Sequence, residues 1–582
     1  MCGLLAYTGI NSKRLHTEVL LESLGTLNHR GPDGSSHIVV DDVFLGHTRL
    51  SIIDLKLGDQ PLTDVTNRFS VIFNGEIFNY KELRENLIKK NYSFETQSDT
   101  EVLLYHFIEF GKEGLIDLNG FFSFVIYDKL EKMIWFSRDR FGIKPLYIYK
   151  TDKQMILASE IKAISKSCKT SLDISDELMD EYIIYGFLAG GRTFHSRLSE
   201  VQPGLLYKYN ITKNNLDMFE WFNVLKFNPE IAISAEQNYW DLISDAISLW
   251  SRSDVPISLL LSGGIDSSII AHALTNENVL AYNLVPSLNS FSSEYDAALN
   301  VSNICGMNLV AVNEQECNID SYLSFMSKFD MPVIDTNYWS LSNLCESINQ
   351  DGIKVTFCGE GADELFAGYE RHTKYADMLR LDDMNLSGVL QENYLSVNRL
   401  SVLKNGGKVH SHPQQRILWL EETRGLDPLE RILRLDQKGF LGAYLKRQDE
   451  VGMLNSIEIR TPFLSNGIFA LSRSTSSSLK TEIPNVGKLQ KAFLKAVLSE
   501  KFGIKHDQKK KLRFNSFLKS SNLEIEKQLI TYFSQKSLTI WEYIKQDRFK
   551  ALIKESSKLI TPGHDNTIFR ILSLSEFIES SR

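Results

Sequence analysis

The 582-residue sequence predicts an α/β protein with two domains, because two stretches with different patterns follow one another along the chain. Up to about residue 205, short runs of alternating apolar and polar residues dominate, and this period of two is typical of half-buried strands. Further along, two apolar runs are each followed by a loop with glycines and then by a helical pattern, at residues 255–268 and 353–364. Such alternation favours a parallel sheet with crossover helices. We therefore expect domains over residues 2–205 and 235–582.

Periodicity also places the elements of the first part. Strand patterns occupy residues 35–54, 121–127, 133–136 and 146–149. Helical spacing marks residues 80–90 and 100–110. Ser98 and Glu101 have the spacing of a capping box, which predicts that the second of these helices begins beside them.

The second part begins less clearly. Residues 210–232 have the poor pattern of a connector, and residues 236–250 have that of an amphipathic helix. The continuous apolar run at 255–261 predicts a strand buried on both faces, and we expect the following helix to begin at Ile269. The remainder up to Arg582 is mainly helical in pattern.

Composition excludes several classes of protein. The 73 acidic residues outnumber the 64 basic ones, and the sequence pI near 5.8 argues against a nucleic-acid binder. No apolar run approaches the ~18 residues of a membrane span, and the first residues lack the pattern of a secretory signal. Six scattered cysteines predict neither a disulfide framework nor a CxxC metal site. We expect a cytoplasmic protein, and a homodimer is compatible with the sequence.

A string of small and polar residues, Ser-Gly-Gly-Ile-Asp-Ser-Ser at 262–268, lies between a buried strand and a helix. Glycines let the backbone approach an anion, and the N-terminus of a helix attracts one. Asp266 would repel a phosphate unless Mg²⁺ lay between them. The alternative is a turn that only joins strand to helix, but the whole string favours a nucleotide site. It is not a Walker loop, since no Gly-Lys-Ser/Thr follows.

Glu360, Asp363 and Glu364 follow the next strand–loop unit. Alone they are equally consistent with a polar turn. Because the carboxyl ends of parallel strands meet at one edge of a sheet, Asp363 and Asp266 together favour a clamp for a metal ion and a triphosphate.

Cys2 is notable because removal of Met1 would leave its thiol beside a free α-amine. The reference pKa of that amine, ~7.7–8.0, lies just below the ~8.5 of a thiol, so one residue can supply both nucleophile and base. The ordinary alternative is a small buried hydrophobe.

Ordered motifs throughout the chain resemble those of the glutamine-dependent asparagine synthetase family. In the first part they lie at residues 1–3, 30–33, 46–54, 74–80, 98–101 and 138–142, and in the second part at 261–268, 358–369 and 449–464. The resemblance implies an N-terminal Ntn-type four-layer α/β/β/α sandwich of class II glutamine amidotransferases. It further implies a C-terminal α/β domain with a parallel sheet, similar to adenine nucleotide α-hydrolases.

The resemblance also implies roles in glutamine cleavage. Cys2 would attack the carboxamide of glutamine, and Asn74 and Gly75 would stabilise the oxyanion. Arg49 would bind the α-carboxylate, while Asp99, with Glu76, would bind the α-ammonium. The alternatives are an ordinary ion pair for Arg49 and Asp99 and a hairpin turn for Asn74-Gly75.

In the second domain the resemblance implies binding of ATP and Mg²⁺. The implied ATP residues are Leu260, Ser262, Gly263, Gly264, Asp266, Ser267, Ser268, Val285, Cys358, Gly359 and Glu360. Asp266 and Asp363 would be the Mg²⁺ ligands. Lys511 is the candidate catalytic lysine, because residues 509–514 fit an Arg-x-Lys-x-x-Phe pattern; a solvated basic turn, or Lys509 or Lys510, remains an alternative.

The implied reaction activates a carboxylate as an acyl-adenylate and amidates it with ammonia from glutamine, through an apolar passage between the domains. Aspartate is the first choice of acceptor, and a uronic-acid sugar is the second, because the sequence departs from the family at four places around the acceptor pocket. These are Asn308-Leu309 for a paired-histidine stretch, Glu450 for Arg, Ser465 for Asp, and Thr336-Asn337 for Pro-Ser. A non-catalytic glutamine sensor is a third alternative. We expect small-molecule partners only, with no nucleic acid and no membrane.

Overall fold

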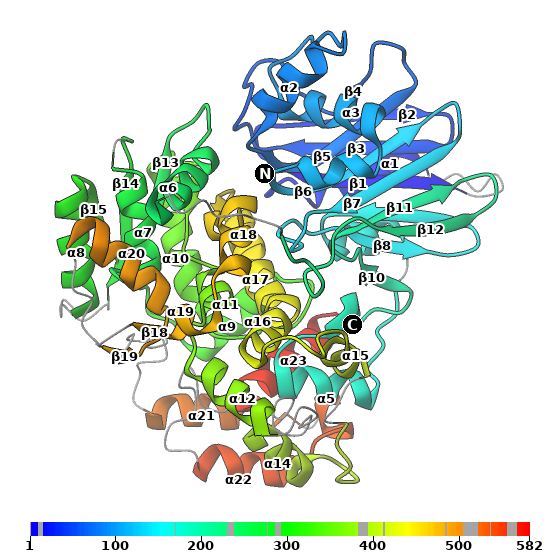
Figure 1. The fold of residues 1–582 in the computed structure, drawn as a ribbon. Coiled ribbons are helices and arrows are strands. Elements are labelled where there is room, and N and C mark those ends of the chain that lie inside the picture. The colour runs from blue at the N-terminus through cyan, green and yellow to red at the C-terminus, as the bar shows by residue number, and fades with distance from the viewer. Residues whose placement is uncertain are drawn as a thin grey trace.

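Two six-stranded antiparallel sheets, packed face to face, form the first part of the molecule in the computed structural model (Figure 1). The structure describes residues 2–9, 16–168, 170–229, 238–275, 277–285, 293–381, 394–410, 414–483, 486–503, 522–535, 537–555 and 567–581. In spatial order the first sheet contains β10 (Leu198–Glu200), β8 (Tyr147–Lys150), β9 (Gln154–Ala158), β1 (Gly3–Gly9), β3 (Val43–Arg49) and β2 (Gly34–Val40). The second contains β12 (Asn215–Glu220), β11 (Leu205–Asn210), β7 (Met133–Arg138), β6 (Gly120–Asp128), β5 (Phe69–Ile77) and β4 (Leu62–Thr63).

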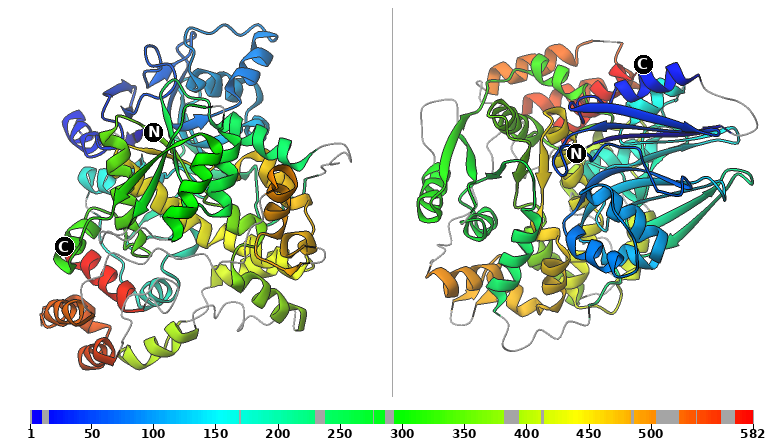
Figure 2. Two further views of the ribbon diagram at one scale, coloured as in Figure 1. Left: turned by 90° about the vertical axis from the view of Figure 1, so that its left-hand side faces the viewer. Right: turned by 90° about the horizontal axis from the view of Figure 1, so that it is seen from above.

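Helices cover the outer face of each sheet. Apolar residues of α1 (Thr17–Gly25) and α4 (Ile161–Ser167) pack on the first sheet, and those of α2 (Tyr80–Ile88) and α3 (Asp99–Phe110) pack on the second. From above, the sheets lie as adjacent layers (Figure 2). The predicted four-layer sandwich is confirmed.

The predicted capping box is half formed. The Ser98 hydroxyl accepts a hydrogen bond from the Glu101 N–H at 3.3 Å, as expected. The Glu101 carboxylate, however, accepts from the main-chain N–H groups of Glu95 and Thr96, at 2.9 and 2.8 Å. It therefore ties the preceding loop to the helix.

The connector expected over residues 210–232 is wrong for its central part, because Asn215–Glu220 forms β12 at the edge of the second sheet. Most of its side chains are exposed on both faces, so the strand lacks the alternation that would have revealed it.

Helix α5 (Asp176–Tyr185) lies within the predicted first domain by sequence, but it packs against α14 (Tyr394–Leu403) and α23 (Thr567–Ser580) of the second part. The predicted division of the chain at residues 205 and 235 stays a prediction.

A five-stranded parallel sheet forms the centre of the second part and confirms that prediction. Its order is β15 (Asn308–Asn313), β14 (Leu280–Val285), β13 (Ile257–Leu260), β16 (Val355–Phe357) and β17 (Glu458–Arg460). The helices α6 (Tyr239–Trp250), α7 (Ile265–Ala273) and α8 (Ser293–Cys305) pack on one side of it, and α10 (Asn337–Gln350) and α17 (Phe440–Leu454) pack on the other.

Helix α7 begins at Ile265, four residues before the predicted start. Gly264 is its N-cap, and Asp266 lies in the first turn, where a negative charge is favourable. The polar residues 266–268 thus belong to the helix rather than to the loop.

The other elements of the second part are mostly helices. They are α9 (Ile319–Met326), α11 (Ala362–Phe366), α12 (Glu370–Leu381), α15 (Gln414–Glu422), α16 (Pro428–Lys438), α18 (Asn466–Ser474), α19 (Ser477–Thr481), α20 (Ala492–Phe502), α21 (Asn522–Tyr532), α22 (Gln546–Glu555) and the strands β18 (Glu482–Ile483) and β19 (Gly487–Lys488). Short 3₁₀ helices lie at η1 (Glu113–Asp117), η2 (Ala189–Gly191), η3 (Pro462–Leu464) and η4 (Thr539–Glu542). In the described residues no helix is both long and apolar enough to cross a membrane.

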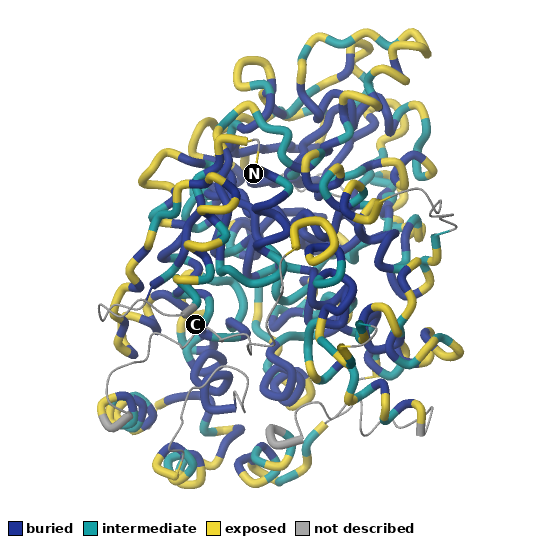
Figure 3. Tube along the Cα trace, turned by 60° about the vertical axis from the view of Figure 1, so that its left-hand side comes forward, coloured by how far each residue is buried: buried dark blue, intermediate teal, exposed yellow. Residues whose placement is uncertain are grey.

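One hydrophobic core continues from the first part into the second. The rings of Phe78 and Trp250 lie 4.7 Å apart, and the Arg460 guanidinium donates to the carbonyl of Trp250 at 2.7 Å. Buried segments accordingly extend through the centre of the molecule (Figure 3). This contact brings the end of β17 close to the first domain.

Candidate active sites

Cys2 is held at both ends of its main chain. Its nitrogen donates to the Asn74 Oδ1 at 3.0 Å, and its carbonyl oxygen accepts from the Arg30 Nε at 3.1 Å. Burial raises the pKa of the thiol, while the positive N-terminus, the Leu50 N–H and Arg49 oppose that increase. The main chain of Cys2 is therefore held in place, and its thiol lies among groups that stabilise a thiolate.

Asn74 and Gly75 lie beside Cys2 on β5. Because the Asn74 Oδ1 accepts from Cys2, its Nδ2 remains a donor, and this buried atom has no hydrogen-bond partner among the described residues. A Cβ at Gly75 would lie 2.1 Å from the Phe121 carbonyl, so only glycine lets β5 pass β6 this closely. An unpaired donor beside a nucleophile suits a developing oxyanion.

The residues predicted to bind the two ends of glutamine lie around Cys2 on different elements. Arg49, at the end of β3, contacts the Asp59 carboxylate at 2.8 Å and the Asp54 carbonyl at 2.6 Å. Asp99, in the first turn of α3, accepts from the Ile77 N–H at 2.9 Å. Among the described residues Arg49 forms its ion pair with Asp59 rather than with Asp99, and the roles of Arg49 and Asp99 in glutamine binding stay predictions.

Two buried carboxyl groups lie together at this site. Burial raises the pKa of Asp99 to about 7, and burial together with the charge of Asp99 raises the pKa of Glu76 well above its usual value. Glu458 of β17 adds to both shifts. A cation such as an α-ammonium would relieve this repulsion.

The loop after β13 is stabilised by its own hydroxyl groups. The Ser262 N–H donates to the Ser267 Oγ at 3.3 Å, and the Ser268 Oγ donates to the Gly264 carbonyl at 2.8 Å. Gly263 has φ +71°, and a Cβ there would lie 2.5 Å from the Ala298 nitrogen on α8. This glycine is therefore required by packing as well as by the approach of a ligand.

Lys491 lies between the two predicted metal ligands. Its Nζ is 2.5 Å from the Asp266 Oδ2 and 2.6 Å from the Asp363 Oδ1. A Cβ at Gly359 would lie 2.6 Å from the Cβ of Asp266, so this glycine allows the two loops to meet. The two carboxylates thus converge on one cation.

This donor set is compatible with Mg²⁺. In the described residues no three His, Cys, Asp or Glu side chains converge on one point. Mg²⁺ is commonly held by one or two carboxylates and by the phosphates of its substrate, so the pair Asp266 and Asp363 is sufficient. The Lys491 ammonium lies between the two carboxylates and contacts both of them.

Glu360 is held by two side chains of α17. The Gln448 Nε2 donates to the Glu360 Oε2 at 2.9 Å, and the Arg447 Nη2 lies 3.3 Å from the same oxygen. Arg447 also contacts the Asp335 Oδ2 at 2.7 Å. One buried cation therefore joins two carboxylates at the predicted acceptor pocket.

The remaining predicted nucleotide residues lie at the strand ends. Leu260 ends β13, Val285 ends β14, and Cys358 directly follows β16, with its N–H donating to the Arg460 carbonyl at 2.9 Å. These strands are neighbours, so their carboxyl ends share one edge of the sheet. Lys511, with Lys509 and Lys510, lies outside the described residues.

Comparison with known families covers both parts of the chain. A family model described as "Glutamine amidotransferase domain" matches residues 1–221, and one described as "Asparagine synthase" matches residues 238–579. The chain belongs to the asparagine synthase family. It is an asparagine synthetase-like, glutamine-hydrolysing ligase.

Two relatives show how wide this similarity is. The chain is 29% identical to "Asparagine synthetase [glutamine-hydrolyzing] 1" of Bacillus subtilis (strain 168), over 78% of this chain and 77% of that protein. It is also 29% identical to "Amidase chyE" of Penicillium rubens (strain ATCC 28089 / DSM 1075 / NRRL 1951 / Wisconsin 54-1255), over 66% of this chain and 61% of that protein.

Two of the places where the sequence departs from the usual family motifs lie at the start of a helix. The Ser465 Oγ accepts from the Ile468 N–H at 3.4 Å and caps α18, a role that Asp and Ser perform equally well. Thr336 is the N-cap residue of α10, and the Asn337 N–H donates to the Asp335 Oδ1 at 3.0 Å. Neither change by itself requires a different acceptor.

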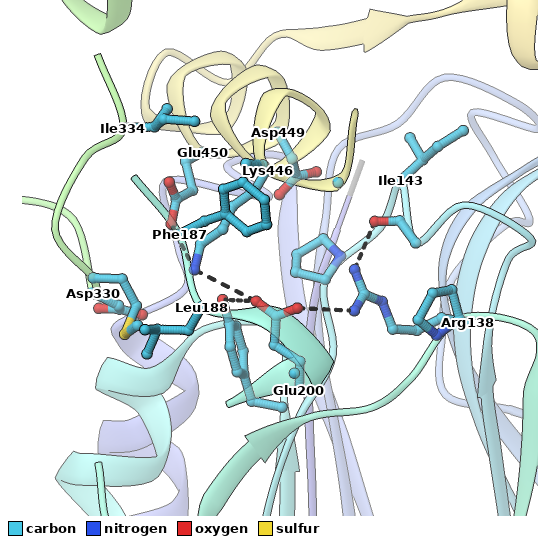
Figure 4. Close-up of a pocket in the computed structure, with 18 of the residues that line it drawn as sticks. Arg138, Ile143, Phe187, Leu188, Glu200, Asp330, Ile334, Lys446, Asp449 and Glu450 are labelled. Carbon is cyan, nitrogen blue, oxygen red and sulfur yellow. Dashed lines mark hydrogen bonds and ion pairs between the residues drawn. The ribbon is translucent and has the colours of Figure 1, made fainter. Parts of the chain in front are cut away.

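Another of these departures, Glu450, lines a cavity of about 150 Å³ between the two parts of the chain (Figure 4). Its carboxylate accepts from the Tyr338 hydroxyl at 3.0 Å and lies 3.9 Å from the Lys446 Nζ. Lys446 also lies 3.5 Å from Glu200. Lys446 therefore joins α17 to the first domain, and Glu450 lies beside that contact.

Sequence reasoning missed Lys491 and Asp449. Lys491 is the N-cap residue of α20, an unfavourable place for a cation unless carboxylates lie nearby, so its position was a usable signal. Asp449 was matched to a motif without a role, and no local pattern shows that it contacts Arg30. The predicted apolar passage between the sites stays a prediction.

Proposed function

We propose that this chain transfers ammonia from glutamine to a carboxylate that it activates with ATP. Asn74 carries the first half of this proposal, because its oxygen holds Cys2 while its buried Nδ2 has no partner among the described residues. A fixed nucleophile beside an unpaired donor is the arrangement that amide cleavage needs. A glutamine sensor would require neither.

Glutamine cleavage would begin with removal of Met1, which frees the α-amine of Cys2. That amine takes the thiol proton, and the thiolate adds to the carboxamide carbon. Asn74 Nδ2 and the Gly75 N–H stabilise the oxyanion. The carbon–nitrogen bond then breaks, ammonia leaves with the proton from the amine, and water hydrolyses the thioester to glutamate.

Activation of the acceptor would occur at the strand ends of the second sheet. The first turn of α7 and the hydroxyls of residues 262–268 bind the phosphates of ATP. Asp266 and Asp363 would hold Mg²⁺, which supplies positive charge to the triphosphate. Lys491 contacts both carboxylates and reaches the phosphates as a second cation.

Aspartate is the acceptor that the pocket supports best. Arg447 lies between Asp335 and Glu360, so the pocket offers both a cation for a carboxylate and an anion for an ammonium. A uronic acid has no ammonium and would leave one of these carboxylates without a substrate partner. It remains the alternative, because relatives of equal identity carry the names asparagine synthetase and amidase.

The deciding experiment measures formation of AMP and pyrophosphate with ATP, Mg²⁺ and a panel of carboxylates. Stimulation by aspartate, together with appearance of asparagine, is the expected result. Stimulation by a uronic acid alone would move the assignment to the alternative. If no carboxylate yields AMP from the intact enzyme, the proposed ligase reaction is wrong.

A further inference from the structure

Helix α17 presents opposite sides to the two reaction sites. Five consecutive buried or half-buried residues make these contacts: Lys446, Arg447, Gln448, Asp449 and Glu450. Gln448 binds Glu360 of the second domain, whereas Asp449 points to the first domain. One helix therefore touches both sites.

Asp449 reaches Cys2 through a single side chain. Its Oδ2 lies 2.9 Å from the Arg30 Nη2, and the Arg30 Nε donates to the Cys2 carbonyl at 3.1 Å. The Arg30 side chain is fully buried, and the Asp449 side chain is 2% exposed. Arg30 also contacts the Glu160 Oε1 at 2.9 Å, so its planar guanidinium is held on three sides.

We infer that Asp449, a residue of the second half of the chain, is a positioning residue for glutamine cleavage by Cys2. It does so by orienting the Arg30 guanidinium, which in turn fixes the main chain of the nucleophile. The inference rests on the proposed function, since it assigns a role within that same glutaminase reaction.

We expect loss of the Asp449 carboxylate to slow glutamine cleavage substantially, because it would weaken the hold on the Arg30 guanidinium. With Asp449 absent, the guanidinium would keep Glu160 and the Cys2 carbonyl, and Glu160 already contacts Lys162 at 2.7 Å. Arg30 could then rotate away from the Cys2 carbonyl. A misplacement of about 1 Å between reacting groups can reduce a rate by about 10²-fold.

The test compares Asp449→Asn with wild type. Asparagine keeps the shape but loses the charge that attracts Arg30, so kcat for glutamine hydrolysis should fall about tenfold or more while KM changes less than about threefold. Synthesis driven by added ammonium should stay within about threefold of wild type, because Asp449 does not contact the second site's reacting groups.

Lys446→Met is the matched control. It lies on the same helix and removes ion pairs with Glu200 and Glu450, but has no contact with Arg30 or Cys2. If this variant loses as much glutamine hydrolysis as Asp449→Asn, the effect is general disruption of the interface and the inference is overturned.

A second measurement uses Arg30→Met alone and with Asp449→Asn. The double variant should be about as slow as Arg30→Met, because both changes remove the same support. Additive losses would overturn the inference, as would full glutamine hydrolysis by Arg30→Met. If Asp449→Asn does not fold, the rate of glutamine hydrolysis by Arg30→Met decides the outcome. If wild type itself releases no glutamate, the proposed function fails instead.

Discussion

The glutaminase site and the nucleotide site both contain paired acidic residues, but the two pairs are balanced differently. At the first site, burial raises the pKa of Asp99, burial and the charge of Asp99 raise the pKa of Glu76, and the Glu76 Oε2 has no hydrogen-bond partner among the described residues. At the second, Lys491 contacts both Asp266 and Asp363.

This difference indicates how each site meets its substrate. The first needs a cation from outside, and the α-ammonium of glutamine is the cation that the proposed reaction supplies. The second already contains a cation, because the Lys491 ammonium contacts both of its carboxylates. Glutamine binding should therefore depend on pH near neutrality, while the nucleotide site should depend on Lys491.

The largest expected effect is a loss of glutamine-driven synthesis that leaves ammonium-driven synthesis unchanged. Cys2→Ala should abolish glutamine-driven synthesis, a loss of at least about 10³-fold, because no other group can form the thioester. Synthesis from ammonium chloride should persist at wild-type rates. Amide formation measured with each nitrogen source checks this, and loss of both would show that the sites are not separable.

Removal of the unpaired Asn74 Nδ2 donor should have the second-largest effect. Asn74→Ala deletes the Nδ2 proposed to stabilise the oxyanion, and loss of one such donor reduces kcat by about 10²–10³-fold. The measurement is steady-state release of glutamate. A KM change with unaltered kcat would place Asn74 in glutamine binding rather than in transition-state stabilisation.

Lys491→Met tests the other side of the comparison. Without the ammonium, Asp266 and Asp363 repel each other and the phosphates, so AMP formation should fall about 10²-fold. Glutamine hydrolysis in the absence of ATP should not change. Lys491→Arg is the control, since it keeps the charge; an active Lys491→Met enzyme would exclude a role for this cation.

Sequence patterns predicted much of this arrangement because their physical causes are local. The parallel sheet follows from the alternation of apolar runs and helices, whereas the four-layer sandwich was implied by the resemblance to the asparagine synthetase family; both are present. The start of α7 was misplaced because Ser and Asp suit both a loop and the first turn of a helix. Strand β12 was missed because its exposed side chains do not alternate.

Sequence patterns could not predict contacts between residues that lie far apart along the chain. Arg30 and Asp449 are separated by 419 positions, and only the packing of α17 on the first domain joins them. Lys491 belongs to a turn far along the chain from Asp266 and Asp363. Sequence spacing identified the carboxylates, but not the cation between them.

The smallest expected effect is the pH dependence of glutamine binding. Because the pKa of Asp99 is raised to about 7, this carboxyl is protonated in the free enzyme below that pH and must lose its proton to bind an ammonium. KM for glutamine should therefore rise as pH falls below about 7, by up to about tenfold per pH unit, and level off above it. Asp99→Asn should raise KM overall and remove this slope. Initial rates of glutamate release between pH 5.5 and 8.5, about the range in which such a group titrates, would measure it. A slope that persists in Asp99→Asn would assign the titration to another group.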